Sequence, residues 1–455
     1  MNQRADHGRN MDKDVSVGGG PVRQCRDRIV AAGLLVACLI AAGSRASAED
    51  WPHWRGPQRN GVVAEHSGFK GGTWPAGEAA WNKNVGQGSS SPLVVAGRLY
   101  TMGWRDGRDT LLCLDAATGN EIWHQSYPCP RFGRRAMGDE GLYSGPQSTP
   151  EYDAATRLLY TLSIDGDLNC WDTATQGRKA WGLNLYQQYD VPRRPQHRRS
   201  GHRDYGYTTS ALVQGEWLIV EVGDDEGTLM AFDKRSGSRV WTSECKDPAG
   251  HTGGPVPITV EGVPCVAVLT YQGLLVARLD AGNEGRTVAT YEWSTDFANN
   301  IATPAVHRNS VLITSGYNRN AICRIDVSLA GARKVWEQPL HSKICSPVVH
   351  QGHVYWSWQK VHCLDFATGQ PRWSGGNFGD AGSCLITADG KLIVWGNRGM
   401  LALVETAAAS PAKYQELARR TNVFSSDVWP HVVLSGRRLY LKDRDGNLKC
   451  FVLKD

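Results

Sequence analysis

Apolar residues in this chain fall mostly in short alternating runs, separated by turns that contain Gly. Alternation over a few positions is typical of strands that are buried on one face, and Gly-containing turns commonly join antiparallel strands. Gly97 and Gly119 stand in two such turns. The clearest stretch of the chain predicts four consecutive strands, at 91–95, 98–102, 111–114 and 121–123.

A motif of the form Asp-x3-Gly-x3-Trp closes this unit and recurs along the chain. It spans 115–123, 233–241 and 365–373, and a copy that is one residue longer spans 172–181. The Asp side chain can accept backbone N–H bonds in such a turn, and Gly tolerates a positive φ there. Recurrence at a fixed spacing indicates an internal repeat, and four antiparallel strands per repeat are typical of a propeller blade.

The repeat gives a count of the blades. Eight segments have the sequence of a first-strand opening: 91–92, 147–150, 208–211, 253–255, 301–304, 345–347, 382–384 and 427–430. Seven aromatic residues are expected in fourth strands: Trp123, Trp181, Trp241, Trp293, Trp336, Trp373 and Tyr414. The last unit, 432–453, lacks a fourth strand, and 80–86 has the sequence of the missing one. We therefore expect residues 49–455 to form one all-β domain, an eight-bladed β-propeller whose N-terminal strand completes the C-terminal blade and leaves no open edge.

Composition agrees with this fold and excludes other classes. The 455 residues include 51 Gly, and 17 Trp against 8 Phe, with 41% apolar and 21% charged residues. This balance excludes a disordered chain and a polytopic membrane protein, and so much Gly disfavours a helical bundle. The formal charge falls from +5 to +2 without residues 1–48, which hold seven basic and four acidic side chains. A nearly neutral body predicts no binding to nucleic acid.

The N-terminus has the pattern of a secretory signal. Arg23, Arg26 and Arg28 precede an apolar run at 29–43, and a small-residue cleavage site follows. We expect residues 1–48 to be a signal peptide with an N-terminal extension, cleaved between Ala48 and Glu49, which predicts a periplasmic or secreted protein with no transmembrane segment in the mature chain. An alternative is lipidation of Cys38 in a lipobox-like sequence, which would give an outer-membrane lipoprotein.

Ten cysteines follow residue 48. Five of them occupy comparable places near a turn, where other units have Ala: Cys113, Cys170, Cys323, Cys363 and Cys450. A position that accepts Cys or Ala indicates a small buried group, so we expect buried thiols there. The other five could include a disulfide, without an assignable pairing: Cys129, Cys245, Cys265, Cys345 and Cys384.

The S/T-P opening, the G-x-L/V-Y second strand and the D-x-x-T/S-G-x-x-x-W closing motif resemble pyrroloquinoline-quinone (PQQ) repeats. Such repeats occur in quinoprotein dehydrogenases and in BamB-type outer-membrane assembly lipoproteins. The segment 50–61, which reads DWPHWRGPQRNG, resembles the opening of secreted PQQ-like propellers of planctomycete bacteria. The resemblance implies the propeller fold over nearly the whole mature chain, whereas an activity depends on the site that a fold carries.

The dehydrogenases of this kind carry adjacent cysteines beside the quinone, a catalytic Asp and a calcium ion held by Glu and Asn. This sequence has neither adjacent cysteines nor a C-x-x-C pair. No residue is therefore carried over as a catalytic, cofactor or metal ligand, and we expect no cofactor. PQQ with calcium remains the alternative.

Several short segments invite a metal-site interpretation. The loops 224–227 and 443–446 contain Asp-Gly hairpin signals but do not fit the EF-hand spacing. His350 and His353 flank a predicted hairpin turn without an evident third ligand. We predict no metal site at any of these positions.

Two polar regions are candidates for binding. Loops directly before first strands are expected to surround one mouth of the central channel, and their candidate residues are Asp247, His251, Thr252, Asp296, Asn299 and Asn300. A long connection between the second and third blades holds a cluster that could meet an anionic partner, namely Arg193, Arg194, Arg198, Arg199 and Arg203. The alternative for this cluster is a solvated loop with salt bridges to Asp190 and Asp204.

These features favour a non-catalytic binding or interaction scaffold, with a possible place in the cell envelope or in outer-membrane protein assembly. We expect a monomer whose partner is a protein or an envelope polysaccharide. The alternative function is a PQQ-dependent dehydrogenase that acts on alcohols or sugars.

Overall fold

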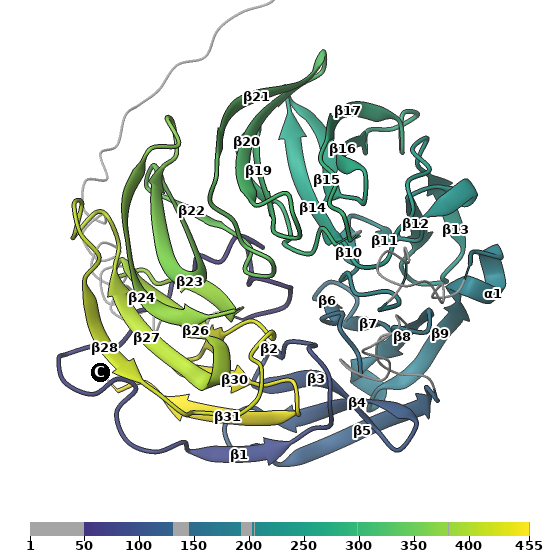
Figure 1. Cartoon of the computed structure of the whole chain (residues 1–455). Coiled ribbons are helices and arrows are strands. Elements are labelled where there is room, and N and C mark those ends of the chain that lie inside the picture. Colours follow the sequence, from purple (N-terminus) through teal and green to yellow (C-terminus); the bar gives the residue numbers. More distant parts are fainter. Residues whose placement is uncertain are drawn as a thin grey trace, which may run out of the picture. The chain divides into compact units, whose positions relative to one another are not determined.

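Eight antiparallel sheets follow one another along the chain and form a ring in the computed structural model (Figure 1). The structure describes residues 50–130, 145–192, 203, 205–297, 299–380 and 382–454. The all-β, eight-bladed propeller predicted from the repeat is confirmed. The expected signal peptide, its cleavage site between Ala48 and Glu49, and Cys38 lie outside the described residues.

The first four blades have four strands each. Blade 1 contains β2 (Leu93–Val95), β3 (Arg98–Arg105), β4 (Arg108–Asp115) and β5 (Glu121–Pro128). Blade 2 contains β6 (Glu151–Asp153), β7 (Leu158–Leu162), β8 (Asp167–Asp172) and β9 (Arg178–Asn184). Blade 3 contains β10 (Leu212–Gln214), β11 (Trp217–Glu221), β12 (Leu229–Asp233) and β13 (Arg239–Thr242). Blade 4 contains β14 (Gly253–Val260), β15 (Val263–Leu269), β16 (Gly273–Arg278) and β17 (Thr287–Glu292).

The second half of the ring follows the same order. Blade 5 contains β18 (Ala305–His307), β19 (Ser310–Ser315), β20 (Ala321–Ser328) and β21 (Gly331–Gln338). Blade 6 contains β22 (Val348–His350), β23 (His353–Asp365) and β24 (Pro371–Gly379). Blade 7 contains β25 (Gly382–Ile386), β26 (Lys391–Gly396), β27 (Met400–Glu405) and β28 (Glu416–Arg420). Blade 8 contains β29 (Val433–Ser435), β30 (Arg438–Lys442), β31 (Asn447–Val452) and β1 (Trp81–Asn84).

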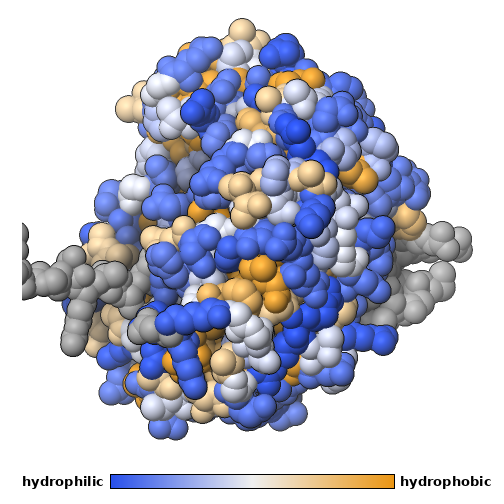
Figure 2. Space-filling view, turned by 90° about the vertical axis from the view of Figure 1, so that its left-hand side faces the viewer, coloured by the Kyte–Doolittle hydropathy of each residue, from blue (hydrophilic) through white to orange (hydrophobic). Residues whose placement is uncertain are grey.

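Helices are short in the described residues. One α-helix, α1 (Leu185–Tyr189), follows blade 2, and three 3₁₀ turns lie at Thr173–Thr175, Asp224–Glu226 and Asn397–Gly399. None of them is long and apolar enough to cross a membrane. Polar side chains predominate on the side of the molecule shown in Figure 2, and apolar residues lie there only in small groups.

Two blades depart from the simple pattern. In blade 6 the single strand β23 supplies both middle strands, because its first half pairs with β22 and its second half pairs with β24. Gln359, at the change of direction, has a φ of 59°. In blade 8 the fourth strand is β1, which pairs antiparallel with β31 and aligns Trp81 with Cys450. This is the pairing expected from the sequence for 80–86.

The repeated Trp and Gly of the closing motif contact each other across blade boundaries. The indole of a fourth strand lies against the turn Gly of the next blade, where a Cβ would overlap the ring; these pairs are Trp81 with Gly119, Trp123 with Gly177, Trp181 with Gly237 and Trp336 with Gly369. Several indole N–H groups also donate to a carbonyl in the next blade, as Trp81 does to Ala116 (3.2 Å) and Trp336 to Phe366 (2.9 Å). The motif therefore joins neighbouring blades as well as forming a turn.

The five thiols expected to be buried near turns are indeed free and buried. Strand register supplies the reason, because four of them lie directly opposite a closing Trp: Cys113 and Trp123, Cys170 and Trp181, Cys363 and Trp373, Cys450 and Trp81. In blade 3 the residue opposite Trp241 is Ala231. A small side chain is needed beside so large a partner.

Two of the seven predicted closing aromatics lie elsewhere. Trp293 follows the end of β17 and its indole donates to Ser315 in the next blade (3.0 Å). Tyr414 precedes β28, and its ring lies edge-on to Trp373, 6.0 Å away between centroids. Blades 4 and 7 therefore have no Trp in the fourth strand, although β17 of blade 4 contains Tyr291.

Candidate binding site

The N-terminal segment 50–61 crosses the central channel. Its backbone pairs with β2 at Trp51 and Val94, and with blade 2 through Pro52 and Tyr152. At its other end the Gly61 carbonyl accepts the N–H of Ile386 (2.8 Å) in blade 7. First strands of a propeller line its channel, so a segment bonded to the first strands of blades 1, 2 and 7 lies within the opening (Figure 1, purple). We call residues 50–61 the plug.

A buried carboxylate fixes the plug to blade 2. Glu151, on β6, is fully buried and accepts two hydrogen bonds from the Arg59 guanidinium, of which Nη1 to Oε2 measures 3.0 Å. His53 Nδ1 lies 3.1 Å from the same Oε2. Burial alone would raise the pKa of Glu151, but the charges of Arg59 and His53 outweigh it and lower that pKa. The carboxylate is therefore charged at neutral pH.

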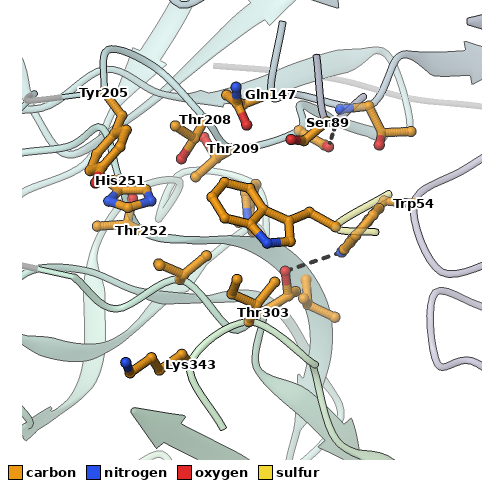
Figure 3. A pocket seen from close by; sticks show the side chains of 18 of the residues that line it. Trp54, Ser89, Gln147, Tyr205, Thr208, Thr209, His251, Thr252, Thr303 and Lys343 are labelled. Atoms are coloured by element: carbon orange, nitrogen blue, oxygen red, sulfur yellow. Dashed lines mark hydrogen bonds between the residues drawn. The ribbon is translucent and has the colours of Figure 1, made fainter. Parts of the chain in front are cut away.

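Aromatic packing holds the middle of the plug. The Trp54 indole donates to Thr303 Oγ1 (3.1 Å), at the opening of blade 5 (Figure 3). The buried His431 ring lies 5.4 Å from the Trp54 ring and 5.8 Å from the Trp51 ring, between centroids. Burial lowers the pKa of His431 to about 3, so this imidazole is neutral. Its packing is that of a structural aromatic residue.

A pocket of about 420 Å³ adjoins the plug. Trp54 and Arg59 of the plug are part of its lining. Side chains from several blades point into this space (Figure 3). Its rings belong to Trp54, Tyr205, His251, Tyr317, Trp358 and Trp429. Its hydroxyl groups belong to Ser89, Thr149, Thr208, Thr209, Ser210, Thr252 and Thr303. Among the described residues its charged groups are two cations and two anions, Arg59, Lys343, Asp380 and Asp427.

Two of the six channel-mouth residues predicted from the sequence, His251 and Thr252, line this pocket. The His251 ring stacks near Tyr205, 4.2 Å away between centroids, and its Nδ1 bonds to Asn299. Thr252 donates to the buried carboxyl of Glu221 (2.8 Å). Burial raises the pKa of Glu221 to about 8, so this group behind the pocket wall is mostly protonated at neutral pH.

The other four predicted residues support the mouth from behind. Asp247 accepts a hydrogen bond from Thr270 (2.6 Å), and Asp296 accepts one from Asn318 (2.5 Å). Asn300 is fully buried and spans two backbone carbonyls, those of Thr270 and Trp293. Asn299 is also buried and orients His251. The six predicted residues thus divide into two that line the pocket and four that lie behind its lining.

The predicted arginine cluster is described only at Arg203. This side chain is 1% exposed, pairs with Asp224 and donates to the Val222 carbonyl (3.3 Å). Its partner is thus neither of the two acids considered from the sequence, and within the described chain its charge is already compensated. Arg193, Arg194, Arg198 and Arg199 lie outside the described residues.

Sequence reasoning missed the residues of the plug. Trp54, Arg55 and Arg59 lie outside the repeat, so no periodic pattern shows where they pack. The available signal was a cluster of Trp and Arg directly after the predicted cleavage site, in a segment with no place in any blade. The pocket rings Trp358, which lies within β23 next to Gln359, and Trp429, which precedes β29, were missed as well.

Calcium and PQQ need a specific set of donors. Calcium takes six to eight oxygen ligands, several of them from carboxylates. The pocket lining offers Asp380, which bonds to Gln359, and Asp427, which lies 3.9 Å from Arg444 Nε. In the described part of the chain no three His, Cys, Asp or Glu side chains gather as a metal site would require. The described lining therefore does not fit a calcium–quinone pair.

Fold and pocket together define an eight-bladed propeller of PQQ-type repeats with a plugged channel. The chain belongs to the family described as outer membrane protein assembly factor BamB, whose sequence pattern matches residues 133–375, more than half of the chain. This confirms the resemblance seen in the repeats. No curated protein matches the chain in sequence.

Solved structures share the fold at low sequence identity. BamB from Moraxella catarrhalis has a TM-score of 0.57 and 15% identity, over 82% of this chain and 98% of that one. The computationally designed Ika8 protein has a TM-score of 0.54 and 13% identity, over 81% and 98%. A europium-containing methanol dehydrogenase has a TM-score of 0.49 and 12% identity, over 86% and 89%. At such identities the likeness concerns the fold alone.

Proposed function

We propose that this protein is a non-catalytic binding scaffold of the periplasm or cell surface, and that the plugged pocket binds a sugar unit of an envelope polysaccharide. The observation that carries the proposal is the lining of the pocket. Rings and hydroxyl groups dominate the part of the lining that the structure describes, where two cations stand against two anions. Aromatic faces and a few placed polar groups suit an uncharged, polyhydroxylated ligand.

The charges of the described lining are partly compensated within the protein. Arg59 is bound by Glu151, whereas Lys343 lies 5.1 Å from the ring centroids of both Tyr317 and Trp358. A strongly anionic ligand would need several unpaired cations, and the described lining offers one, Lys343. A volume of about 420 Å³ lies within the range of small-ligand pockets.

The family supports a role in the cell envelope, since its description names outer membrane protein assembly. On this proposal the pocket holds the scaffold to the polysaccharide, and the outer surface of the ring remains available to protein partners. Cleavage of the N-terminal segment at Ala48 belongs to the same proposal.

Binding can be followed by tryptophan fluorescence, because Trp54, Trp358 and Trp429 line the pocket. The probes are neutral disaccharides and tetrasaccharides of β-linked glucose and of β-linked N-acetylglucosamine. We expect saturable quenching that Trp358→Ala abolishes. The matched control is Trp217→Ala, which removes a ring that packs on Trp241 in blade 3, outside the pocket lining.

Three outcomes would contradict the proposal. Binding that survives Trp358→Ala would place the sugar elsewhere. Binding of unstructured peptides in preference to sugars would make the pocket a protein site. Retention of added PQQ and calcium, with dye reduction on alcohols, would establish the dehydrogenase function instead.

A further inference from the structure

Two cysteines from neighbouring blades face each other beneath the plug. Cys345 precedes β22 in blade 6, and Cys384 lies on β25 in blade 7. Their sulfur atoms are 3.9 Å apart and both side chains are 1% exposed. A disulfide bond is about 2.05 Å long, so the two thiols are in contact but not bonded. Neither cysteine is part of the described pocket lining.

A buried cation lies beside this pair. Arg55, in the plug, is 1% exposed, and its guanidinium donates only to the backbone carbonyls of Pro347 and Asn60 (3.3 Å to the latter). Within the described residues, its Nε and Nη1 atoms have no hydrogen-bond partner. Leaving a charge buried without a counter-charge is strongly unfavourable. Arg55 therefore needs an anion, and no carboxylate of the described chain pairs with it.

The thiols are the ionisable groups positioned to provide that anion. Cys345 and Cys384 are the two groups whose charge acts on Arg55. Cys345 also accepts the backbone N–H of Ser357 (3.4 Å). A hydrogen bond from Cys384 outweighs burial and, with the Ser357 N–H and the Arg55 charge, lowers the pKa of Cys345. The same hydrogen bond, together with burial, raises the pKa of Cys384.

We propose that Arg55 holds Cys345 as a thiolate, and that Cys345 and Cys384 form a redox-active pair that closes into a disulfide between blades 6 and 7. The oxidant belongs to the class of disulfides, either a small-molecule disulfide or the disulfide of an oxidoreductase. Thiol–disulfide exchange requires a thiolate, which is the form that Arg55 stabilises.

The exchange takes place in two steps. The Cys345 thiolate attacks one sulfur of the oxidant, forms a mixed disulfide and releases the other sulfur as a thiolate. Cys384 then loses its proton to that thiolate and attacks the sulfur of Cys345, which forms the Cys345–Cys384 bond and releases the second half of the oxidant. Two protein thiols lose two electrons in total, and one disulfide becomes two thiols.

Oxidation would also loosen the plug. The disulfide removes the thiolate and leaves Arg55 buried without a counter-charge. Arg55 directly follows Trp54, whose side chain is part of the pocket lining. The redox state of the pair is therefore coupled to the seating of the plug. Conversely, both cysteines are 1% exposed, so exchange in the folded protein needs a transient opening, which release of residues 50–61 would provide.

The test uses the full folded protein with oxidised glutathione as the probe, followed by non-reducing peptide mapping. We expect one cross-linked peptide pair that joins Cys345 to Cys384. Cys384→Ser should trap a glutathione adduct on Cys345, and Cys345→Ser should leave no adduct at either position. The matched control is Cys363→Ser, which removes a buried thiol opposite Trp373 and should leave the cross-link unchanged.

The role of Arg55 is tested by measuring the thiolate absorbance of Cys345 as a function of pH. At each pH the spectrum of Cys345→Ser is subtracted from that of the wild-type protein. We expect a thiolate at neutral pH in wild type and in Arg55→Lys, and a titration shifted upward by at least about one pH unit in Arg55→Gln. If Arg55→Gln does not fold, the wild-type difference spectrum still decides the point. A neutral Cys345 at pH 7, or a cross-link that forms only in denaturant, would overturn the proposal.

Discussion

The indole of Trp181 in blade 2 lies against the Cα of Gly237 in the turn of blade 3, so closely that a Cβ on Gly237 would stand 2.6 Å from Cε3 of the ring. The same indole donates its N–H to the carbonyl of Lys234 in that turn (3.2 Å). One contact thus explains two positions of the repeated motif, and the two positions can be tested separately.

We expect Gly237→Ala to destabilise the protein by about 2–4 kcal/mol, since it adds overpacking to backbone strain. The control is Gly97→Ala, because Gly97 has nearly the same φ (73° against 75°) but no atom within 4 Å of the place that a Cβ would take. That variant should lose only about 1–2 kcal/mol. Chemical denaturation measures both, and equal losses would show that the Trp contact contributes nothing.

Trp181→Phe keeps most of the ring but removes one of two donors to the Lys234 carbonyl, which keeps the Tyr160 hydroxyl (2.9 Å). We expect a loss of about 1 kcal/mol or more, because a buried carbonyl loses a partner along with some ring area. Trp241→Phe is the matched control, since the Trp241 indole N–H has no hydrogen-bond partner within the described residues. A loss in the control as large as in Trp181→Phe, measured by thermal unfolding, would remove the hydrogen bond as the cause.

Glu151→Gln tests the attachment of the plug. We expect a loss of about 2–4 kcal/mol at pH 7, because the charge of Arg59 remains without its carboxylate. The folded-state pKa of Glu151 is lowered, so its contribution is present above the ordinary value of 4.5 and is lost as pH falls through the folded-state pKa. The two proteins should therefore converge in stability at low pH. A difference that stays constant across pH would contradict this assignment.

The contribution of Glu221 to stability should depend on pH in the opposite sense to that of Glu151. Burial raises the pKa of Glu221 to about 8, so the folded protein holds a proton there that the unfolded chain releases above about 4.5. Wild-type stability should fall between these values by up to about 1.4 kcal/mol per pH unit from this group. The amide keeps an acceptor for Thr252 and cannot ionise, so the variant should be the more stable protein at pH 8. Parallel stability curves for the two proteins would contradict the protonated state.

The repeat allowed the blade number and the pairing of 80–86 with the last blade to be predicted, because the first-strand openings recur eight times and the Asp-x3-Gly-x3-Trp turns have a local cause where they occur. It misplaced Trp293 and Tyr414, where that local signal is absent and only packing with the next blade determines the position. His251 and Thr252 were found because they precede a first strand. Trp54, Arg55 and Arg59 were not, since their partners Thr303, Pro347 and Glu151 lie far away in sequence and belong to different blades.

The pairing of Trp81 with Cys450 has a consequence for the order of folding. Within the described chain β1 is the earliest strand and β31 the last, so β1 has no partner while the seven blades between them are synthesised. The plug likewise lacks its partners in blades 5 to 8 until those blades have been synthesised. Contacts of such sequence separation form late and slowly. The first described part of the chain to be synthesised is therefore among the last to reach its native place, and until then it is an unpaired, aromatic-rich segment open to chaperones and proteases.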